Sequence, residues 1–299
     1  VLSLLLGTAI TVILSGNIVR PVNALSTAMQ RVANGDYDVK LETKSNFEII
    51  RRVYSDFNHM VDELNAVETL RNDFVSNVSH EFKTPLSSIE GYAMLLQDES
   101  LSAEARSEYT ERIVVSTRRL STLVSNILMI TKIENQTIPF TLSSYRVDEQ
   151  VRQSILLLEN KWSEKNIGFE MDMDSIEFCA VEGLLGNVWS NLIDNAIKFS
   201  PEGEIIYISL KEKDDMLSFK IANRGEPMSG ETLKRIFEKF YQGDTSHKRE
   251  GNGLGLALVK KIVRVHGGSV SAVNTEDGLI EFTVNLPAKR SCERCCGSN

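Results

Sequence analysis

The residues most able to carry chemistry stand together in SHEFKTP, positions 79–85. His80 is one of only four histidines, and Glu81 beside it can accept or orient an imidazole proton. Thr84 follows one helical turn after His80 on the same face. Pro85 deprives the carbonyl of Glu81 of its helical partner, so the helix should bend there. The stretch hints at a nucleophilic histidine but does not by itself name the reaction.

The helical pattern around His80 predicts that its side chain lies on the exposed face of the helix. Apolar residues around it step by three, four or seven positions, as one face of an amphipathic helix does: Val75, Val78, Phe82, Ile89, Tyr92 and Leu96. At 100° per residue, His80 falls almost opposite this stripe. We therefore expect its imidazole to face solvent or an incoming partner. Ordinary solvation is the alternative for an outward histidine.

A second polar set lies on one face of an otherwise apolar helix in NLIDNAIKFS, residues 191–200. Asn191, Asn195 and Lys198 are spaced at i, i+4 and i+7. Carboxamide oxygens can coordinate Mg²⁺, and a lysine ammonium pairs with phosphate oxygens. The spacing favours a site for a metal-bound phosphate chain over plain surface polarity.

A third set is the glycine-alternating stretch GNGLGLALVKKIV, which runs into an apolar helix. Gly251, Gly253 and Gly255 expose bare main chain before a helix N-terminus, where an anion is favoured. The stretch fits neither GxGxxG nor GxxxxGK[ST], so it does not predict a dinucleotide fold or a P-loop. The aromatic run IFEKFYQ, residues 236–242, precedes it and suggests a hinged lid.

Length and charge limit the classes of protein to consider. The chain has 299 residues, which predicts two or more domains. A net charge of −8 argues against a nucleic-acid partner. Residues 1–19 contain no charged side chain, and Arg20 and Arg31 follow them. We expect a transmembrane helix with a cytoplasmic C-terminal end; a buried soluble helix is the alternative.

Helical periodicity accounts for the rest of the first half. Residues 20–66 predict a helix, a break at NGDYD and a second helix. Two longer amphipathic patterns, at 67–98 and about 104–134, predict an antiparallel hairpin. One chain cannot bury all of these apolar stripes. We therefore expect a homodimer, with a four-helix bundle at the hairpin.

The second half alternates short strand-like and helical segments. Strands are expected at 167–173, 204–210, 216–222 and 279–286. Helices are expected near 147–163, 182–199, 230–238 and 254–266. The pattern predicts an α+β domain whose sheet is covered by helices.

In chain order, SHEFKTP, NLIDNAIKFS, IFEKFYQ and GNGLGLALVKKIV resemble the H, N, F and G2 boxes of bacterial sensor histidine kinases. The resemblance covers nearly the whole chain and implies a multidomain fold. It implies a transmembrane helix at 1–19, an all-α HAMP signal-relay module at 20–70, a dimerisation and histidine phosphotransfer hairpin at 66–138, an α+β ATP-binding sandwich of the Bergerat or GHKL fold at 145–288, and a disordered tail at 289–299.

The resemblance also implies a reaction and its residues. His80 would attack the γ-phosphate of ATP, Glu81 would take up or share the imidazole proton, and Thr84 would position water in the reverse, phosphatase reaction. The phosphoryl group would pass to an aspartate of a separate response regulator. ATP and Mg²⁺ are the implied cofactors, with the metal held by Asn195 and Asn191. The other implied nucleotide contacts are Lys198, Asn223, Gly225, Lys239, Phe240, Tyr241, Gly251, Gly253, Gly255 and Leu256.

The adenine-reading loop departs from the family pattern DxGxG, because it has the sequence NRGEP. Asn223 stands in place of the aspartate, and Pro227 in place of the second glycine. A carboxamide oxygen can accept a hydrogen bond from the adenine amino group but carries no charge, so we expect adenine binding to survive with lower affinity. Gln242 stands where the family often has arginine, and Lys239 is a candidate substitute.

Three alternatives remain. A degenerate family member acting mainly as a phosphatase or scaffold would explain Asn223, Pro227 and Gln242. A nucleotide-switched binding module is disfavoured by the hairpin that carries SHEFKTP. A structural coiled-coil membrane protein would leave the N and G2 boxes unexplained. The family resemblance implies a location in the inner membrane of a bacterium, with the catalytic part in the cytoplasm.

Overall fold

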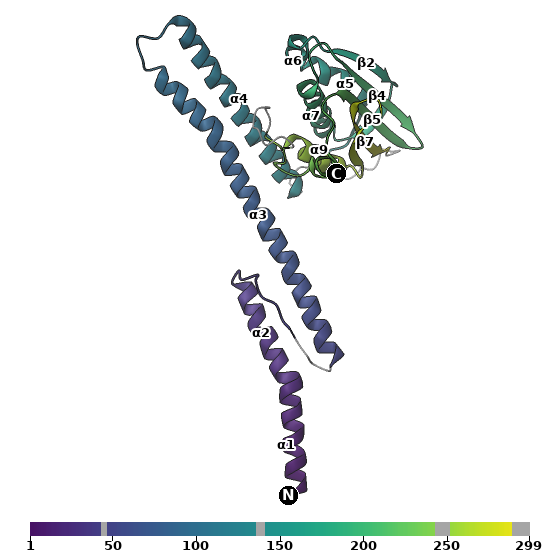
Figure 1. Cartoon of the computed structure of the whole chain (residues 1–299). Coiled ribbons are helices and arrows are strands. Elements are labelled where there is room, and N and C mark those ends of the chain that lie inside the picture. The colour runs from purple at the N-terminus through teal and green to yellow at the C-terminus, as the bar shows by residue number, and fades with distance from the viewer. Residues whose placement is uncertain (43–46, 136–140, 243–251, 289–299) are drawn as a thin grey trace, which may run out of the picture. The chain divides into compact units, whose positions relative to one another are not determined.

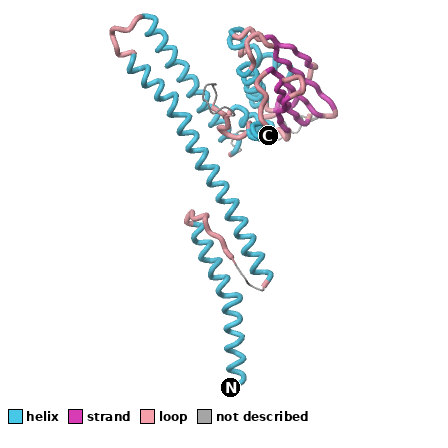
Figure 2. The backbone as a smooth tube through the Cα atoms, in the orientation of Figure 1, coloured by secondary structure: helices cyan, strands magenta, loops and turns pink. Residues whose placement is uncertain are grey.

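The computed structural model describes residues 1–42, 47–135, 141–242 and 252–288 (Figure 1). The expected disordered tail at 289–299 and Gly251 of the glycine stretch lie outside the described residues. The chain divides into two compact units, Val1–His80 and Glu81–Asn299. Figure 2 shows that the described part of the first unit is helical apart from one connecting segment, whereas the second also contains all the strands.

The first unit begins with a helix that continues through a wider turn. Helix α1 (Leu2–Leu14) passes into the π-helical turn η1 (Ser15–Val19) and then α2 (Arg20–Ala33). Judged by length and hydropathy alone, one helix among the described residues could cross a membrane, and it is α4 (Ala103–Glu134). The core helix of a soluble protein can have the same length and hydropathy. Helix α1 has only 13 residues by itself, so the expected transmembrane helix at 1–19 stays a prediction.

A small core joins α2, the segment after it and the start of α3 (Glu48–Leu95). Its buried residues are Ala28, Val39, Phe57 and Val61. The side chain of Asn58 brackets the main chain of Leu41 with two hydrogen bonds of 2.9 Å. Gly35 supplies the positive φ of 87° at the end of α2, a conformation that glycine adopts without strain. The predicted helix, break and helix over residues 20–66 are confirmed.

Helix α3 is longer than the sequence predicted. The patterns before and after residue 66 were expected to form separate helices, but they form one helix of 48 residues. No glycine or proline lies near this junction, so nothing local ends the helix there. Pro85 is buried inside α3, and the helix continues past it to Leu95.

The predicted antiparallel hairpin is confirmed. Ser102 begins α4, and its side chain accepts a hydrogen bond from the main-chain N–H of Ala105 at 3.2 Å. The rings of Tyr92 and Tyr109 have centroids 5.6 Å apart near the loop. Further from the loop, Glu81 of α3 pairs with Arg119 of α4. Because the later residue of α3 meets the earlier residue of α4, the two helices run in opposite directions.

The part of the second unit after the hairpin is built on a five-stranded sheet of order β2-β4-β5-β7-β6. Strands β2 and β4 are parallel, and the other neighbours are antiparallel. The sequence predicted four of these strands and missed β6, as well as the separate β1–β3 ribbon. The bounds are β1 Ser143–Arg146, β2 Gly168–Met173, β3 Glu177–Ala180, β4 Ile205–Lys213, β5 Met216–Arg224, β6 Ser269–Asn274 and β7 Leu279–Pro287.

Helices cover one face of this sheet, as the sequence predicted (Figure 1). Trp189 of α7 packs on Phe219 of β5, with ring centroids 4.7 Å apart. Alternate residues of β4, β5 and β7 point into this core, and the residues between them are more exposed. The helices are α5 Val147–Leu156, α6 Glu159–Glu164, α7 Glu182–Phe199, α8 Gly230–Arg235 and α9 Gly255–Val265.

Arg146 and Asp148 form an ion pair where the chain passes from β1 into α5, the first helix of this domain. Two hydrogen bonds, at 2.8 and 2.6 Å, join the guanidinium to the carboxylate. Asp148 Oδ1 also accepts the main-chain N–H of Ile176 at 3.3 Å, which ties the start of α5 to the segment before β3. These hydrogen bonds, that from Arg146 first, lower the pKa of Asp148 to about 2.

Candidate active site

His80 and Thr84 are both exposed on α3, as their helical spacing predicted. Glu81 differs from them, because its side chain is only 13% exposed. Its Oε2 lies 3.6 Å from Nη2 of Arg119 on α4. The exposed His80 is thus followed by a carboxylate that forms an ion pair with the other helix of the hairpin. Sequence reasoning missed Arg119, although two adjacent arginines within the apolar pattern of α4 were a signal.

The N box and the glycine stretch meet directly. Asn191 of α7 donates from Nδ2 to the main-chain oxygen of Asn187 at 2.7 Å, which orients its amide. A Cβ added to Gly255 would lie 2.6 Å from Asn191 Oδ1. Any larger residue at this position would therefore force the Asn191 amide to move, away from the position in which it bonds to Asn187. The glycine at the start of α9 allows the two boxes to pack together.

The glycine stretch also meets the aromatic box. Gly253 has a φ of 64°, and a Cβ there would lie 2.6 Å from the carbonyl carbon of Phe240. The main-chain N–H of Phe240 donates to the oxygen of Gly253 at 2.9 Å. Phe240 itself has a φ of 63°, which is uncommon for a residue with a side chain. The segment before α9 is thus held against the end of the aromatic box.

The altered adenine loop begins at the end of β5. Asn223 is 2% exposed, and its Nδ2 donates to the main-chain oxygen of Arg224 at 3.0 Å. A Cβ on Gly225 would lie 3.1 Å from Ile280 Cδ1 and 3.6 Å from the oxygen of Phe199. The loop therefore passes close to β7 and to the end of α7. This brings Asn223 and Gly225 to the same end of the domain as the N box.

The remaining N-box residues lie further along α7. Asn195 is half-buried, and Lys198 Nζ lies 4.7 Å from the ring centroid of Phe199. Sequence reasoning missed Lys165, whose Nζ donates to three main-chain oxygens at this helix end. A lysine at the negative end of a helix dipole is favourable. Lys165 therefore stabilises the turn that carries Lys198.

The lid residues have partners inside the protein. Tyr241 Oη lies 3.4 Å from Thr232 Oγ1, and the Arg235 guanidinium lies 4.6 Å from the ring centroid of Tyr241. Lys239 Nζ donates to Glu134 Oε1 at the end of α4, at 2.9 Å. Lys239 thus pairs with a carboxylate here, and its expected role at a phosphate stays a prediction. Leu256 is half-buried against the domain core.

No group of three or more His, Cys, Asp or Glu side chains in the described ranges could hold a metal ion. The N box offers another kind of donor set. Asn191 and Asn195 are one turn apart, and their carboxamide oxygens are hard ligands of the kind that Mg²⁺ accepts alongside water and phosphate. The donor chemistry of α7 therefore fits a metal that arrives with a phosphate chain.

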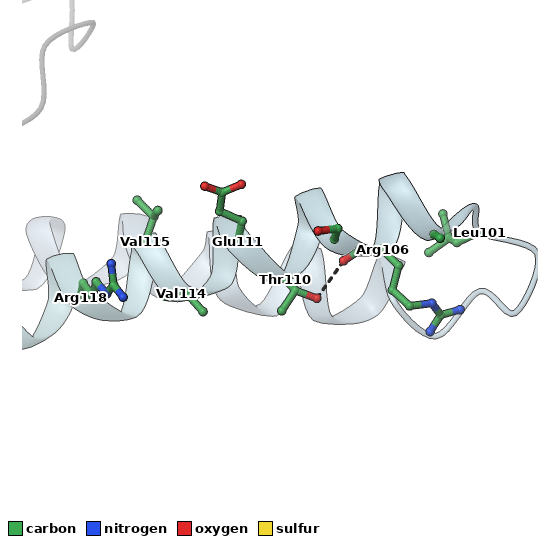
Figure 3. Close-up of a pocket in the computed structure, with 9 residues that line it drawn as sticks. Leu101, Arg106, Thr110, Glu111, Val114, Val115 and Arg118 are labelled. Carbon is green, nitrogen blue, oxygen red and sulfur yellow. Dashed lines mark hydrogen bonds between the residues drawn. The ribbon is translucent and has the colours of Figure 1, made fainter. Parts of the chain in front are cut away.

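An open hollow of about 820 Å³ follows the first half of α4 (Figure 3). Val114 and Val115, which line it, are 41% and 45% exposed. Leu101 from the loop before α4 also contributes to the lining. This part of α4 therefore presents apolar side chains that a single chain leaves uncovered.

Three family models match successive parts of the chain. Residues 13–66 match the HAMP domain, and residues 70–136 match the His Kinase A (phospho-acceptor) domain. Residues 180–290 match the histidine kinase-, DNA gyrase B-, and HSP90-like ATPase. The order agrees with that of the expected modules. The domain boundaries drawn from the sequence remain predictions.

Individual proteins resemble the chain over most of its length. The heme sensor protein HssS of Staphylococcus aureus (strain JH9) is 33% identical over 288 residues, which are 96% of this chain and 62% of HssS. The chain thus spans less than two thirds of the length of these curated relatives.

Two solved structures share the fold. Full-length ShkA in complex with AMPPNP has a TM-score of 0.55 at 27% identity, over 74% of this chain and 47% of ShkA. Histidine kinase ThkA in complex with the response regulator protein TrrA has a TM-score of 0.60 at 23% identity, over 77% of this chain and 65% of that one. The likeness to sensor proteins and the HAMP match together suggest a membrane location.

Proposed function

The chain belongs to the bacterial two-component sensor histidine kinases, and we propose that it phosphorylates its own His80 with ATP and passes the phosphoryl group to an aspartate of a response regulator. The observation that carries this proposal is the direct packing of Asn191 against Gly255. It joins the two expected phosphate-binding boxes into one site. The same chain presents an exposed His80 on a separate helical element.

The proposed chemistry divides between the two elements. An imidazole nitrogen of His80 attacks the γ-phosphorus, and the bond from that phosphorus to the bridging oxygen of ADP breaks. The nitrogen that attacks must be the unprotonated one, because its lone pair forms the new bond to phosphorus. Glu81 takes up or shares the proton that the imidazole loses, and Arg119 forms an ion pair with its carboxylate at 3.6 Å. Thr84, on the exposed face, positions water when the regulator is dephosphorylated.

The ATP-binding domain supplies position and charge. Asn195, assisted by Asn191, holds Mg²⁺, which neutralises phosphate charge when it is bound. Lys198 contacts the phosphate chain, and Asn223 accepts the adenine amino group. The remaining proposed contacts are Gly225, Lys239, Phe240, Tyr241, Gly251, Gly253, Gly255 and Leu256.

The proposed assembly is a homodimer through the hairpin and the HAMP module. The support is the open apolar hollow beside Val114 and Val115. The proposed location is the inner membrane of a bacterium, with residues 1–19 in the lipid and the catalytic part in the cytoplasm. Helix α1 and η1 provide a run of 18 uncharged helical residues, at most about 27 Å long, which is close to the thickness of a bilayer core.

Incubation of the purified chain with γ-labelled ATP and Mg²⁺ tests the activity. We expect acid-labile label on the protein that is absent from His80→Gln, while His59→Gln on the same helix keeps it. The label should move to a cognate response regulator when that protein is added. Label that persists in His80→Gln would contradict the assignment of the nucleophile.

A second candidate is a degenerate member that acts mainly as a phosphatase or scaffold. It is favoured by Asn223, Pro227 and Gln242, and by the pairing of Lys239 with Glu134. In the same assay this candidate predicts ATP binding without label on His80. Loss of phosphoryl groups from a pre-phosphorylated regulator would then identify the phosphatase.

A further inference from the structure

Asn274, the last residue of β6, lies in one row with the adenine loop. Ile280 of β7 pairs with Asn223 of β5 on one side and with Asn274 of β6 on the other. Directly paired residues of antiparallel strands point to the same face of the sheet. Asn223, Ile280 and Asn274 therefore share one face, with Ile280 in the middle.

The loop after Asn223 passes over this row. A Cβ on Gly225 would lie only 3.1 Å from Ile280 Cδ1, so the loop lies close to the middle of the row. Beyond it, the main-chain N–H of Met228 donates to Asn274 Oδ1 at 3.0 Å. Asn274 Nδ2 donates to the main-chain oxygen of Met228 at 2.7 Å. One side-chain amide thus satisfies both main-chain groups of Met228, as a neighbouring strand would.

The loop is therefore held at Gly225, close to Ile280, and at Met228, by Asn274. The Oδ1 atom of Asn223 remains open as a hydrogen-bond acceptor. Its Nδ2 is engaged by the oxygen of Arg224. Among the described residues, its Oδ1 accepts no hydrogen bond, although the residue is 2% exposed. A carboxamide oxygen with this open acceptor position suits a ligand donor such as an exocyclic amino group. Asn274 occupies the N–H of Met228 and one lone pair of its carbonyl oxygen, so the Met228 main chain has no N–H left to offer a base.

We propose that Asn274 is a positioning residue for nucleotide binding, because its amide holds Met228 and keeps the loop in place so that Asn223 reads the purine base. The proposal rests on the proposed ATP-dependent function. Pro227 already restricts the loop before Met228, since its ring fixes φ. Pro227 and Asn274 thus restrain the same short segment, one covalently and one by hydrogen bonds.

Asn274→Ala tests the proposal in the full chain, with ATP as the probe. We expect the KM for ATP in autophosphorylation to rise about tenfold, as the loss of two modest hydrogen bonds implies. The rate at saturating ATP should stay the same, since His80 and the phosphate site are untouched. The preference for ATP over GTP should also fall, because the loop that positions the base against Asn223 would no longer be held in place.

Matched variants separate positioning from a general loss of structure. Ser271→Ala lies on the same strand, exposed and away from the loop, and should leave the KM unchanged. Asn274→Asp keeps the acceptor for the Met228 N–H but places a second oxygen against the Met228 carbonyl, so it should raise the KM at least as much as Ala. Thermal melting without nucleotide should be nearly the same for all of these variants.

Pro227→Gly provides a second test that leaves the sheet intact. With Asn274 present, we expect a small rise in the KM. With both substitutions, the rise should exceed the product of the single effects, because each residue restrains the segment when the other is lost. Unchanged KM and base preference in Asn274→Ala, or independent effects of the two substitutions, would overturn the proposal. A wild-type chain that does not bind ATP would instead refute the proposed function.

Discussion

Leu86, Val114 and Val115 of the hairpin are 57%, 41% and 45% exposed, whereas the apolar core residues of α7 are at most 3% exposed. In α4, the buried residues all belong to its second half: Leu123, Ile130 and Ile133. The helix that carries the proposed nucleotide-binding residues therefore packs on a core made by one chain. His80 lies on helix α3 of the hairpin, whose apolar surface is only partly covered. In the proposed mechanism, assembly can change the surroundings of His80 while the ATP site stays intact.

The largest difference between the ATP-binding domain and the hairpin is expected when the proposed Mg²⁺ ligand Asn195 is removed. Asn195→Ala should slow autophosphorylation roughly a thousandfold, because a Mg²⁺ ligand contributes several kcal/mol to stabilising phosphoryl charge. The dimer should be unaffected. Labelling at a series of Mg²⁺ concentrations measures the change, and Asn187→Ala, two turns earlier on α7, is the matched control. Equal losses in both variants would remove the special role of Asn195.

Substitutions on the hairpin should have the opposite result, with dimerisation weakened and ATP binding unchanged. Replacing Val114 and Val115 with Glu should raise the dimer dissociation constant by about a hundredfold or more, since each buried valine contributes about 1.5–3 kcal/mol. ATP binding by the other domain should not change. Analytical ultracentrifugation and nucleotide titration measure the two quantities. Glu111→Gln, which also lines the hollow, tests whether charge alone matters. A dimer that persists in the double variant would place the interface elsewhere.

A smaller effect concerns the stability of the ATP-binding domain alone. Asp148→Asn should lower its free energy of unfolding by about 1 kcal/mol at pH 7, a value reduced from the pKa shift because Arg146 is half-exposed and screened. The pKa of Asp148 is lower in the folded protein, so its contribution is complete above about pH 4 and is lost as the pH falls toward 2. Urea unfolding at several pH values measures this difference, which should vanish near pH 2.

The smallest effect is expected at the adenine loop. Asn223→Asp should tighten ATP binding about threefold, because a charged acceptor makes the stronger hydrogen bond. The gain is limited, since a carboxylate cannot replace the donation from Nδ2 to the oxygen of Arg224. Calorimetry with ATP measures the affinity, and hairpin dimerisation serves as the unaffected reference. Weaker binding would mean that the donated bond outweighs the charge.

Much of the architecture could be predicted from local pattern. The hairpin, the strands β2, β4, β5 and β7, and the exposed faces of His80 and Thr84 follow from the spacing of apolar residues. Strand β6 was missed because SVSAVN has weak alternation and small side chains. The continuity of α3 was missed because most residues between Leu64 and Val75 are polar, which interrupts the apolar pattern that marks one helix.

The sequence by itself determined which residue types are available for phosphoryl transfer and which helix or loop carries each of them. It did so because helical and strand periods are local properties of the chain. Only the tertiary structure decided that Asn191 meets Gly255, that Arg119 pairs with Glu81, and that Asn274 holds Met228. Each of these contacts joins residues far apart in sequence, and depends on how whole elements pack to bury their apolar faces.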